Sequence, residues 1–456
     1  MSATAGVGVS GLAALARRGL ERLSQEDPRL YQLLEQEYER QNNVLMMVAA
    51  SSVADPSVLA CEGTPTVNVT TEGYPGARFH AGCRYVDEIE RLAVERAKAA
   101  FGARYANVQP HSGSSANAIV ICGLLRPGDT ILGQEISAGG HLTHGARASF
   151  SGQFFRAIGY GVDAQGLIDY AQVERLAHEH KPRLIICGAS AYPRAIDFAR
   201  FRAIADAVGA YLLADISHIA GLVAAGVHQS PVDHAHFTTT STYKQLYGPR
   251  GGLILIGRDA DTLAPDGRRT LPELIQRAVF PFFQGTPSLN AITAKARALA
   301  IVAGPEFKVL ARRIVADARA LADAFSARGY RVLTGGTDNH MVLIDVWSSR
   351  TISGLVAERA LEECDIVINK NAIAGDSKSV TVTSGMRLGS NGLAHRGMGE
   401  AEMEACAGLV DGILGSIRVT GERDYELDPE ARAAYRSRVA ELCARFPIPH
   451  YPPPSA

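Results

Sequence analysis

Apolar and polar positions change their spacing several times through the middle of the chain. Three short runs, at 183–187, 211–215 and 252–256, are almost continuously apolar, as strands buried on both faces are. Amphipathic stretches such as 198–208 separate them. Between residues 85 and 101 the apolar positions keep helical spacing up to Gly102, a typical C-terminal cap. This alternation predicts a wound, mostly parallel sheet.

The two ends of the chain have a different pattern. Residues 1–50 are charged, have helical spacing and lead into an apolar stretch, which predicts an N-terminal helical arm. After residue 304 we expect a long helix over about 306–328, then short strands at 330–333 and 340–345. The sequence therefore predicts an α/β fold in three parts: the arm (1–50), a large ligand-binding domain (51–304) and a smaller C-terminal α+β domain (305–456).

Composition narrows the possible functions. Lys plus Arg number 46 and Asp plus Glu number 47, and this balance provides no general field for nucleic acid or an anionic membrane. No apolar run reaches membrane-spanning length, and the first residues lack a signal-type apolar core. Seven cysteines are scattered without a CxxC pair or a Cys/His cluster, which argues against disulfides and zinc. We expect a cytoplasmic protein without a metal site.

Lys244 is the first candidate for chemistry. It lies in the segment 237–252, where a hydroxyl-rich run meets a glycine-flanked turn just before an apolar strand. A partly desolvated lysine on a rigid loop can condense with an aldehyde cofactor. The alternative is a solvated surface lysine, and the segment alone does not decide between the two.

Asp215 strengthens the first interpretation. It ends an apolar strand upstream of Lys244. A carboxylate at the C-terminal end of such a strand faces the ligand crevice, where it can keep a pyridine nitrogen protonated so that the ring accepts electrons. The alternative is that Asp215 only caps the next helix.

Two further segments could hold the rest of such a cofactor. Small hydroxyl residues at 111–117 pass into an apolar helix, whose free backbone N–H groups can receive a phosphate. His141 follows two glycines, where an imidazole could stack on a flat ring. A lone histidine is more often a core residue, so His141 counts only together with the other groups.

Six segments, in this order, carry a family resemblance. They are Thr71-Glu-Gly-Tyr-Pro-Gly76, Asn107-Val-Gln-Pro-His-Ser-Gly-Ser114, Gly139-Gly-His-Leu-Thr-His-Gly145, Gly248-Pro-Arg-Gly-Gly252, Gly335-Gly-Thr-Asp-Asn-His340 and Thr383-Ser-Gly-Met-Arg-Leu-Gly389. From about residue 30 to residue 447 the chain resembles serine hydroxymethyltransferase. That family has the fold-type I (aspartate aminotransferase-like) architecture, uses pyridoxal 5'-phosphate and passes one-carbon units to tetrahydrofolate.

The resemblance implies a role for each matching residue. Lys244 would carry the Schiff base, Asp215 would pair with the pyridinium, His141 would stack on the ring and Glu72 would be the acid/base carboxylate on the folate side. Further cofactor contacts would be Ser112, Gly113, Ser114, Ser190, His218, Gly285 and Thr286. Arg387 would clamp the substrate carboxylate, for which a bidentate guanidinium is suited. Folate contacts would be Glu72, Leu142, Asn371 and Ser379.

The resemblance also implies a shared active site. Thr70, Glu72, His80 and the loop 284–286 would reach the site of the neighbouring chain, so that a homodimer is the minimum. Pairing of dimers into a tetramer is compatible with the same site.

Departures from the family pattern gather around the amino-acid pocket. The usual tyrosine two residues before the glutamate is Thr70, the usual tyrosine pair is Phe79-His80, and the usual histidine before the lysine is Tyr243. Three other segments also differ: Ala50-Ser-Ser52, Pro281-Phe-Phe-Gln-Gly-Thr286 and Gly389-Ser-Asn391. A threonine in place of a tyrosine leaves room for an extra methyl group on Cα, while His80 and Tyr243 would complete the substrate pocket.

These changes resemble those of 2-methylserine hydroxymethyltransferases, which leave D-alanine. Three alternatives stay open: an ordinary serine/glycine hydroxymethyltransferase, a folate-independent aldolase or transaldolase for β-hydroxy amino acids, and a catalytically silent relative that binds cofactor or a partner such as RNA. Retention of Lys244, Asp215, Glu72 and Arg387 argues against the silent relative.

Overall fold

A seven-stranded sheet is the centre of the protein, whose residues 10–453 are described by a computed structural model. The strand order is β4-β10-β9-β8-β7-β5-β6; β5 to β9 pair in parallel, whereas β10 is antiparallel to β9 and β4. The predicted mostly parallel sheet is confirmed. Its strands are β4 (Tyr105–Asn107), β5 (Thr130–Gln134), β6 (Arg156–Tyr160), β7 (Leu184–Cys187), β8 (Tyr211–Asp215), β9 (Phe237–Ser241) and β10 (Gly252–Ile256).

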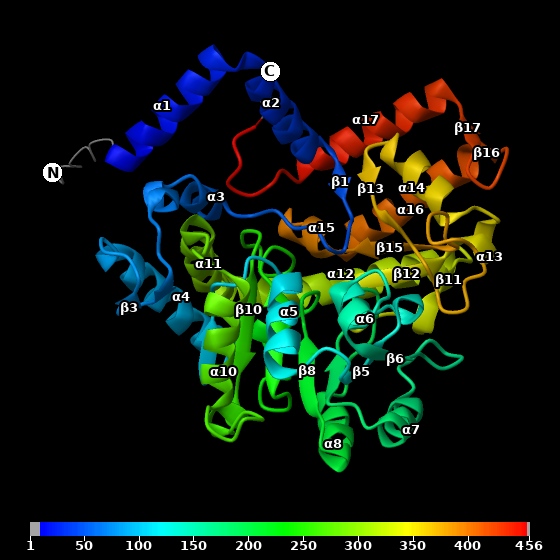
Figure 1. Cartoon of the computed structure of the whole chain (residues 1–456). Helices are drawn as coiled ribbons and strands as arrows, with labels where there is room; N and C mark the ends of the chain where they lie inside the picture. The colour runs from blue at the N-terminus through cyan, green and yellow to red at the C-terminus, as the bar shows by residue number, and fades with distance from the viewer. Residues whose placement is uncertain (1–9, 454–456) are drawn as a thin grey trace.

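Helices cover both faces of this sheet (Figure 1). Successive strand residues such as Leu212 and Leu213 enter different cores, because side chains alternate across a strand. One core is closed by α4 (Arg84–Phe101), α7 (Tyr170–His180), α8 (Phe198–Val208), α9 (Ala220–Ala224), α11 (Leu289–Val302) and the start of α12 (Pro305–Ala327). The other is closed by α5 (Gly113–Leu124), α6 (Phe150–Phe154) and α10 (Leu271–Arg277).

A second, smaller sheet has its own core. Its order is β11-β12-β15-β14, with strands β11 (Arg331–Val332), β12 (Met341–Asp345), β14 (Asn369–Asn371) and β15 (Gly385–Gly389). It packs with the second half of α12 and with α13 (Val346–Arg350), α14 (Gly354–Glu362), α15 (Asn391–His395), α16 (Glu400–Ser416) and α17 (Pro429–Arg445). A hairpin of β16 (Ile417–Val419) and β17 (Tyr425–Leu427) follows α16.

The N-terminal segment begins with two helices, α1 (Gly11–Glu26) and α2 (Pro28–Asn43). The dark blue α1 projects beyond the rest of the chain (Figure 1). After α2 the chain forms β1 (Leu45–Met46), which pairs in parallel with β13 (Ile366–Val367), and Leu45 and Met47 enter the core of the smaller sheet. The last residues of the predicted arm are thus part of the C-terminal layer. Residues 1–9 of the arm lie outside the described residues, as do 454–456 of the predicted small domain.

Several predicted elements are confirmed almost residue for residue. α8, β8 and β10 have the predicted bounds, and α12 differs from the expected long helix by one residue at each end. α4 ends at Gly102, which has a φ of 65°. Glycine adopts that left-handed conformation without the steric penalty of a Cβ. Among residues 10–453 no helix is long and apolar enough to cross a membrane.

Candidate functional site

Three parallel strands bring the main candidates to one edge of the large sheet. Asp215 is the last residue of β8, Ser190 follows β7, and Lys244 follows β9. Because neighbouring parallel strands end on the same side, these residues converge there. The structure therefore places residues up to 54 positions apart in sequence, from Ser190 to Lys244, at the same edge of the sheet.

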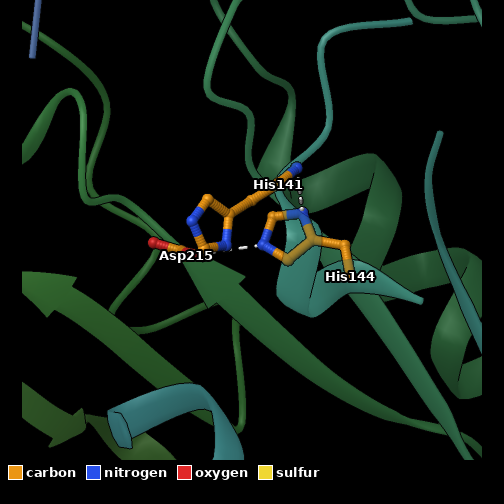
Figure 2. Close-up of side chains that lie close together, drawn as sticks. All are labelled: His141, His144 and Asp215. Carbon is orange, nitrogen blue, oxygen red and sulfur yellow. Dashed lines mark hydrogen bonds and ion pairs between the residues drawn. The ribbon is translucent and has the colours of Figure 1, made fainter. Parts of the chain in front are cut away.

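Asp215 is held by several donors. Its Oδ2 accepts hydrogen bonds from Asn117 Nδ2 at 2.7 Å and from His144 Nε2 at 3.2 Å, and its Oδ1 accepts one from the backbone N–H of Ser217 at 3.0 Å. Figure 2 shows Asp215 together with His144 and His141. Burial raises the pKa of the Asp215 carboxyl, but the hydrogen bonds that it accepts from His144 and Ser217 oppose burial, and the pKa is held well below its usual range. Asp215 is therefore a buried, ionised carboxylate.

The tautomer of His144 follows from its neighbours. Its Nδ1 accepts the backbone N–H of His141 at 3.3 Å, so the proton is on Nε2 and is donated to Asp215 (Figure 2). His141 is itself held by Thr143 Oγ1 at 2.8 Å from its Nδ1. Burial lowers the pKa of His141 to about 4, with the charge of Asp215 opposing. His141 is thus a neutral ring near Asp215, which suits stacking on a flat cationic heterocycle.

The donor atoms of His141, His144 and Asp215 lie within 4.8 Å of one another. A metal ion could bridge that spacing. Asp215 Oδ2, however, already accepts two N–H bonds, from Asn117 and His144, which an ion would have to displace. The hydrogen-bond pattern therefore favours an organic cation beside Asp215 over a metal.

Lys244 lies in the turn between β9 and β10 and is 7% exposed. Burial lowers the pKa of its amine to about 8; Asp215 opposes this, while Arg387 and Arg250 lower it further. Its Nζ lies 5.8 Å from the centre of the Tyr243 ring, and the Arg250 guanidinium stacks on the same ring at 3.7 Å. Lys244 therefore loses its proton far more easily than a solvated lysine does.

This pKa makes a prediction for cofactor loading. An amine must be neutral to add to an aldehyde, and the neutral fraction rises with pH. With the pKa of Lys244 at about 8 instead of 10.5, we expect the rate at which unloaded protein binds pyridoxal phosphate to rise with pH and level off above about 8. Stopped-flow absorbance measures this rate. A rate that keeps rising to the ordinary lysine range would contradict the prediction.

The start of α5 is the segment predicted to hold the phosphate. Ser112 is its N-cap, and the Ser112 Oγ accepts the N–H of Ser115 at 3.0 Å. Gly113 lets this turn approach β9, since an added Cβ would lie 3.1 Å from Ser241 Cβ and 3.2 Å from Ser217 Oγ. The Ser241 Oγ is buried and has no hydrogen-bond partner among residues 10–453. A phosphate at this helix start would meet both free N–H groups and a free hydroxyl.

Arg387 lies at the middle of β15 and faces Lys244 from the smaller sheet. It is buried, and within the described chain it forms no ion pair; its Nε donates to Asn369 Oδ1 at 3.0 Å and its Nη1 to the Ser190 carbonyl. Burial lowers the pKa of Arg387 to about 10, with Tyr243 opposing, so the guanidinium stays charged. A buried guanidinium without a carboxylate partner is suited to a carboxylate ligand.

His218 and Ser190 lie beside this group. Burial and the charges of Lys244 and Arg387 keep the pKa of His218 well below its usual value, and its buried Nδ1 has no partner among the described residues. Its ring stacks on that of His340 at 6.0 Å. Ser190 is tied to the His141 loop, because its N–H donates to the Gly139 carbonyl at 2.8 Å. His218 thus lies near Lys244, and Ser190 is joined to Arg387 through its backbone carbonyl.

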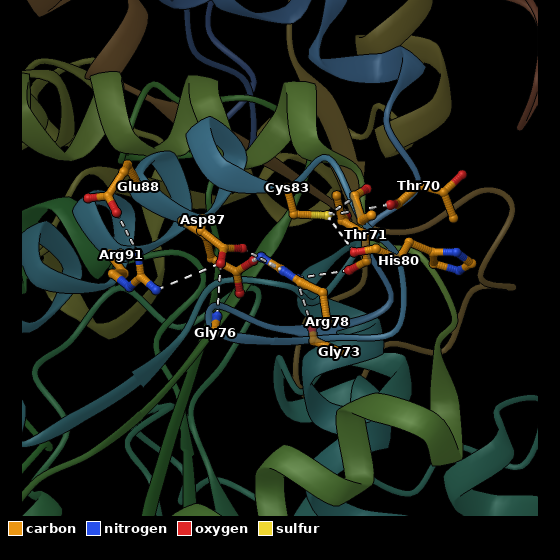
Figure 3. A network of polar contacts seen from close by, with 12 residues as sticks. Thr70, Thr71, Gly73, Gly76, Arg78, His80, Cys83, Asp87, Glu88 and Arg91 are labelled. Carbon is orange, nitrogen blue, oxygen red and sulfur yellow. Dashed lines mark hydrogen bonds and ion pairs between the residues drawn. The ribbon is translucent and has the colours of Figure 1, made fainter.

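A second group of candidates surrounds the hairpin of β2 (Gly73–Tyr74) and β3 (Ala77–Arg78), which lies beyond α3 (Pro56–Glu62). Arg78 anchors the hairpin through ion pairs to Asp87 at 2.8 Å (Figure 3) and to Glu90 at 2.6 Å. His80 points away from this anchor (Figure 3), and its Nε2 lies 3.3 Å from Glu72 Oε2. The anchored hairpin thus holds the Glu72 carboxylate in a partly exposed position.

The hairpin group meets the loop after the π-helix 278–283. A Cβ added to Gly285 would lie 3.3 Å from Glu72 Oε1, and Gln284 Oε1 accepts the N–H of His111 at 3.2 Å. In residues 10–453 no hydrogen bond or ion pair joins Glu72, Thr70 or His80 to Lys244. The structure therefore gathers the predicted residues into two groups, one around Lys244 and one around Glu72.

The predicted folate contacts Leu142, Asn371 and Ser379 lie in three different segments. Leu142 is exposed and lines a cavity of about 480 Å³ together with His141, Ser114 and Phe283. Asn371 ends β14, where its Nδ2 donates to the Ala372 carbonyl at 2.6 Å, and Ser379 Oγ lies 3.0 Å from Thr381 Oγ1. Only Leu142 thus lies directly beside His141.

Two residues that hold Asp215 were not among the candidates predicted from the sequence. Asn117 joins Asp215 to Thr143 Oγ1, at 2.8 Å, and its Oδ1 accepts from Thr239 Oγ1. His144 donates to the same carboxylate. The available signal was spacing: Asn117 lies one helical turn after Gly113 and therefore faces the same side of α5.

One comparison with known families gives a match. A family model described as serine hydroxymethyltransferase matches residues 23–410. The match covers both sheets and every candidate residue named above.

Proposed function

The chain belongs to the serine hydroxymethyltransferase family, and from this premise we propose that it cleaves 2-methylserine and passes the one-carbon unit to tetrahydrofolate, giving D-alanine and 5,10-methylenetetrahydrofolate. Enzymes of this family use pyridoxal phosphate, with tetrahydrofolate as cosubstrate. The substrate assignment is carried by one observation, the small side chain of Thr70 where the family has a tyrosine. Around it the pocket has the further exchanges His80 and Tyr243.

The residues present fit the cofactor. Lys244 has the lowered pKa that Schiff-base formation requires, Asp215 is the ionised partner for a pyridinium, and His141 is a neutral ring for stacking. Ser112 to Ser114, with Ser241, would hold the phosphate. When bound, pyridoxal phosphate supplies an electron-accepting ring that allows a bond at Cα to break.

The amino-acid end is proposed to lie between Arg387 and Tyr243. Arg387 binds the carboxylate, since it is charged, buried and without an ion-pair partner in the described part of the chain. Tyr243 is held in place by the Arg250 stack at 3.7 Å and by Ser52, whose Oγ donates to its backbone carbonyl. Arg387 and Tyr243 are therefore both held in place. In this proposal the size of the Thr70 side chain determines which substituent on the substrate Cα fits.

A quaternary Cα restricts the chemistry. 2-Methylserine has no α-hydrogen, so loss of a proton at Cα is closed to it and release of the hydroxymethyl carbon as formaldehyde is the productive route. Glu72 is proposed to move protons between the substrate hydroxyl and the folate. Its 3.3 Å contact with His80 gives it a partner through which to exchange a proton.

Two chains are proposed to complete each site. Thr70 and His80 are exposed in the single chain, and Phe79 beside His80 in the sequence is 73% exposed. Together with the separation of the Glu72 and Lys244 groups, this supports a homodimer in which the hairpin of one chain reaches the Lys244 group of the other.

The substrate assignment is tested with Thr70→Tyr. Pure parent and variant are assayed with tetrahydrofolate and either 2-methyl-L-serine or L-serine. We expect the parent to prefer 2-methylserine and the variant to shift the kcat/KM ratio toward serine by roughly 10- to 100-fold, the range for one methyl group in a tight pocket. Thr262→Tyr, at an exposed threonine, is the matched control and should leave the ratio unchanged.

Ordinary serine/glycine hydroxymethyl transfer is the second candidate, favoured by the retained Glu72, Asn371 and Arg387. Faster turnover of serine than of 2-methylserine by the parent would decide for it, whereas an unmoved ratio in Thr70→Tyr would contradict only the steric role of Thr70. Omitting tetrahydrofolate separates both transferases from an aldolase, because only an aldolase keeps its rate.

A further inference from the structure

A second lysine is buried close to the cradle. Lys295 of α11 is 1% exposed, and its Nζ donates to the carbonyls of Val108 (2.6 Å), Pro110 (3.0 Å) and Gly252 (3.0 Å). Three acceptors use all three N–H bonds of an ammonium, whereas a neutral amine has two to give. The geometry therefore fits the charged form.

This charge has no carboxylate of its own. Lys295 takes part in no ion pair between residues 10 and 453, and Glu90, whose charge acts on it, is already bound by Arg78 at 2.6 Å and by Gln109 at 2.7 Å. Burial lowers the pKa of Lys295 to about 7, with Glu90 opposing. A buried cation in this situation is stabilised by any anion that binds nearby.

The three carbonyls that accept from Lys295 belong to two segments, one before the phosphate cradle and one after the Lys244 turn. Val108 and Pro110 lie between β4 and α5, directly before Ser112. Gly252 opens β10, pairs with Ser241 at the end of β9, and donates its N–H to the Pro110 carbonyl at 2.9 Å. The Lys244 turn connects these same two strands. One ammonium thus links the phosphate cradle to the base of the Lys244 turn.

Two glycines make this contact possible. A Cβ on Gly251 would lie 2.2 Å from Lys295 Cε, so the lysine stem occupies the space that glycine leaves. A Cβ on Gly252 would lie 2.3 Å from the Ser112 carbonyl oxygen. The stem, the turn and the cradle are therefore packed against one another, and a shift of one is transmitted to the others.

The charge of Lys295 also reaches the cradle. Burial lowers the pKa of His111, the residue before Ser112, and the charge of Lys295 lowers it further. The N-terminus of α5 adds its own partial positive charge at the same place. Two independent sources of positive potential therefore act where the phosphate is expected.

We propose that Lys295 is a positioning residue for the cofactor phosphate: it fixes the cradle against the base of the Lys244 turn and supplies positive potential behind it. The proposal rests on the phosphate role of Ser112 to Ser114 and is independent of which amino acid is the substrate. It predicts that replacing Lys295 lowers the affinity for a ligand that carries the phosphate group more than the affinity for the same ring without it.

The test compares pyridoxal phosphate with pyridoxal, which has the same ring and aldehyde without the phosphate. Unloaded Lys295→Met keeps a long apolar stem but lacks the charge and the three donors. By absorbance titration we expect its affinity for pyridoxal phosphate, relative to pyridoxal, to fall at least about tenfold, which corresponds to 1.4 kcal/mol. Lys308→Met, at an exposed lysine, should leave this ratio unchanged.

An equal loss for both ligands, or no loss, overturns the proposal, because a lysine that only supports the fold affects ring and phosphate alike. If Lys295→Met does not fold, Lys295→Gln, which has two donors and no charge, is compared in the same way and judged by the same ratio. A parent that fails to turn over 2-methylserine would leave these binding results intact, so the two proposals fail separately.

Discussion

Replacing Lys244 by alanine is expected to abolish the absorbance change on cofactor binding and to lower turnover by about 10³-fold, the size of effect for a group that handles protons in the transition state. The reason is the combination of burial, a pKa of about 8 and a position between Asp215 and Arg387. No other lysine is in that position within residues 10–453. Absorbance spectra and initial rates measure the two effects.

Lys308→Ala is the control for Lys244→Ala, because Lys308 is exposed on α12. It should bind cofactor and turn over substrate like the parent. A Lys244→Ala protein that keeps both the spectrum and the rate would show that another amine holds the cofactor. Retention of the spectrum alone would mean that Lys244 acts in catalysis without carrying the Schiff base.

Replacing Arg387 by glutamine is expected to raise the KM for the amino acid by roughly 10- to 100-fold, the cost of losing a charge-assisted, two-pronged contact to a carboxylate. The KM for tetrahydrofolate should change little. Arg387→Lys keeps the charge but not the planar fork and should recover only part of the loss. Steady-state kinetics with each substrate varied in turn separates these effects.

Arg359→Gln is the matched control, since Arg359 is exposed on α14 in the same layer as Arg387. Thermal unfolding is measured in parallel, because Arg387 also donates to Asn369 and to the Ser190 carbonyl. Equal increases in both KM values, or an unchanged KM for the amino acid, would contradict the carboxylate role.

Local patterns in the sequence were sufficient for most of the framework. β8 and β10 are apolar runs with polar or glycine residues at their ends, and such runs can be recognised without knowing their neighbours. The end of α4 was predictable because Gly102 adopts a conformation that other residues rarely do. Asp215 was found because it ends an apolar strand, and Lys244 because a hydroxyl-rich run meets a glycine-flanked turn just before another strand.

The surroundings of these residues were not predictable in that way. The hydrogen bond from His144 to Asp215 joins residues 71 apart, and the contact of Arg387 with Ser190 spans 197 positions. Spacing along the chain carries no information about such pairs. The end of the N-terminal arm was predicted too simply for the same reason, because β1 pairs with β13 more than 300 residues later.

The sequence by itself determined which residue types are available and where strands end, and with them the family and the candidate residues Lys244, Asp215, His141 and Arg387. Only the tertiary structure decided the state and partners of these groups: the ionised Asp215 held by His144 and Asn117, the guanidinium of Arg387 with no carboxylate partner among residues 10–453, and Lys295 bound to the backbone beside the cradle. The physical reason is that burial and charge, which set these states, arise from groups brought together by folding.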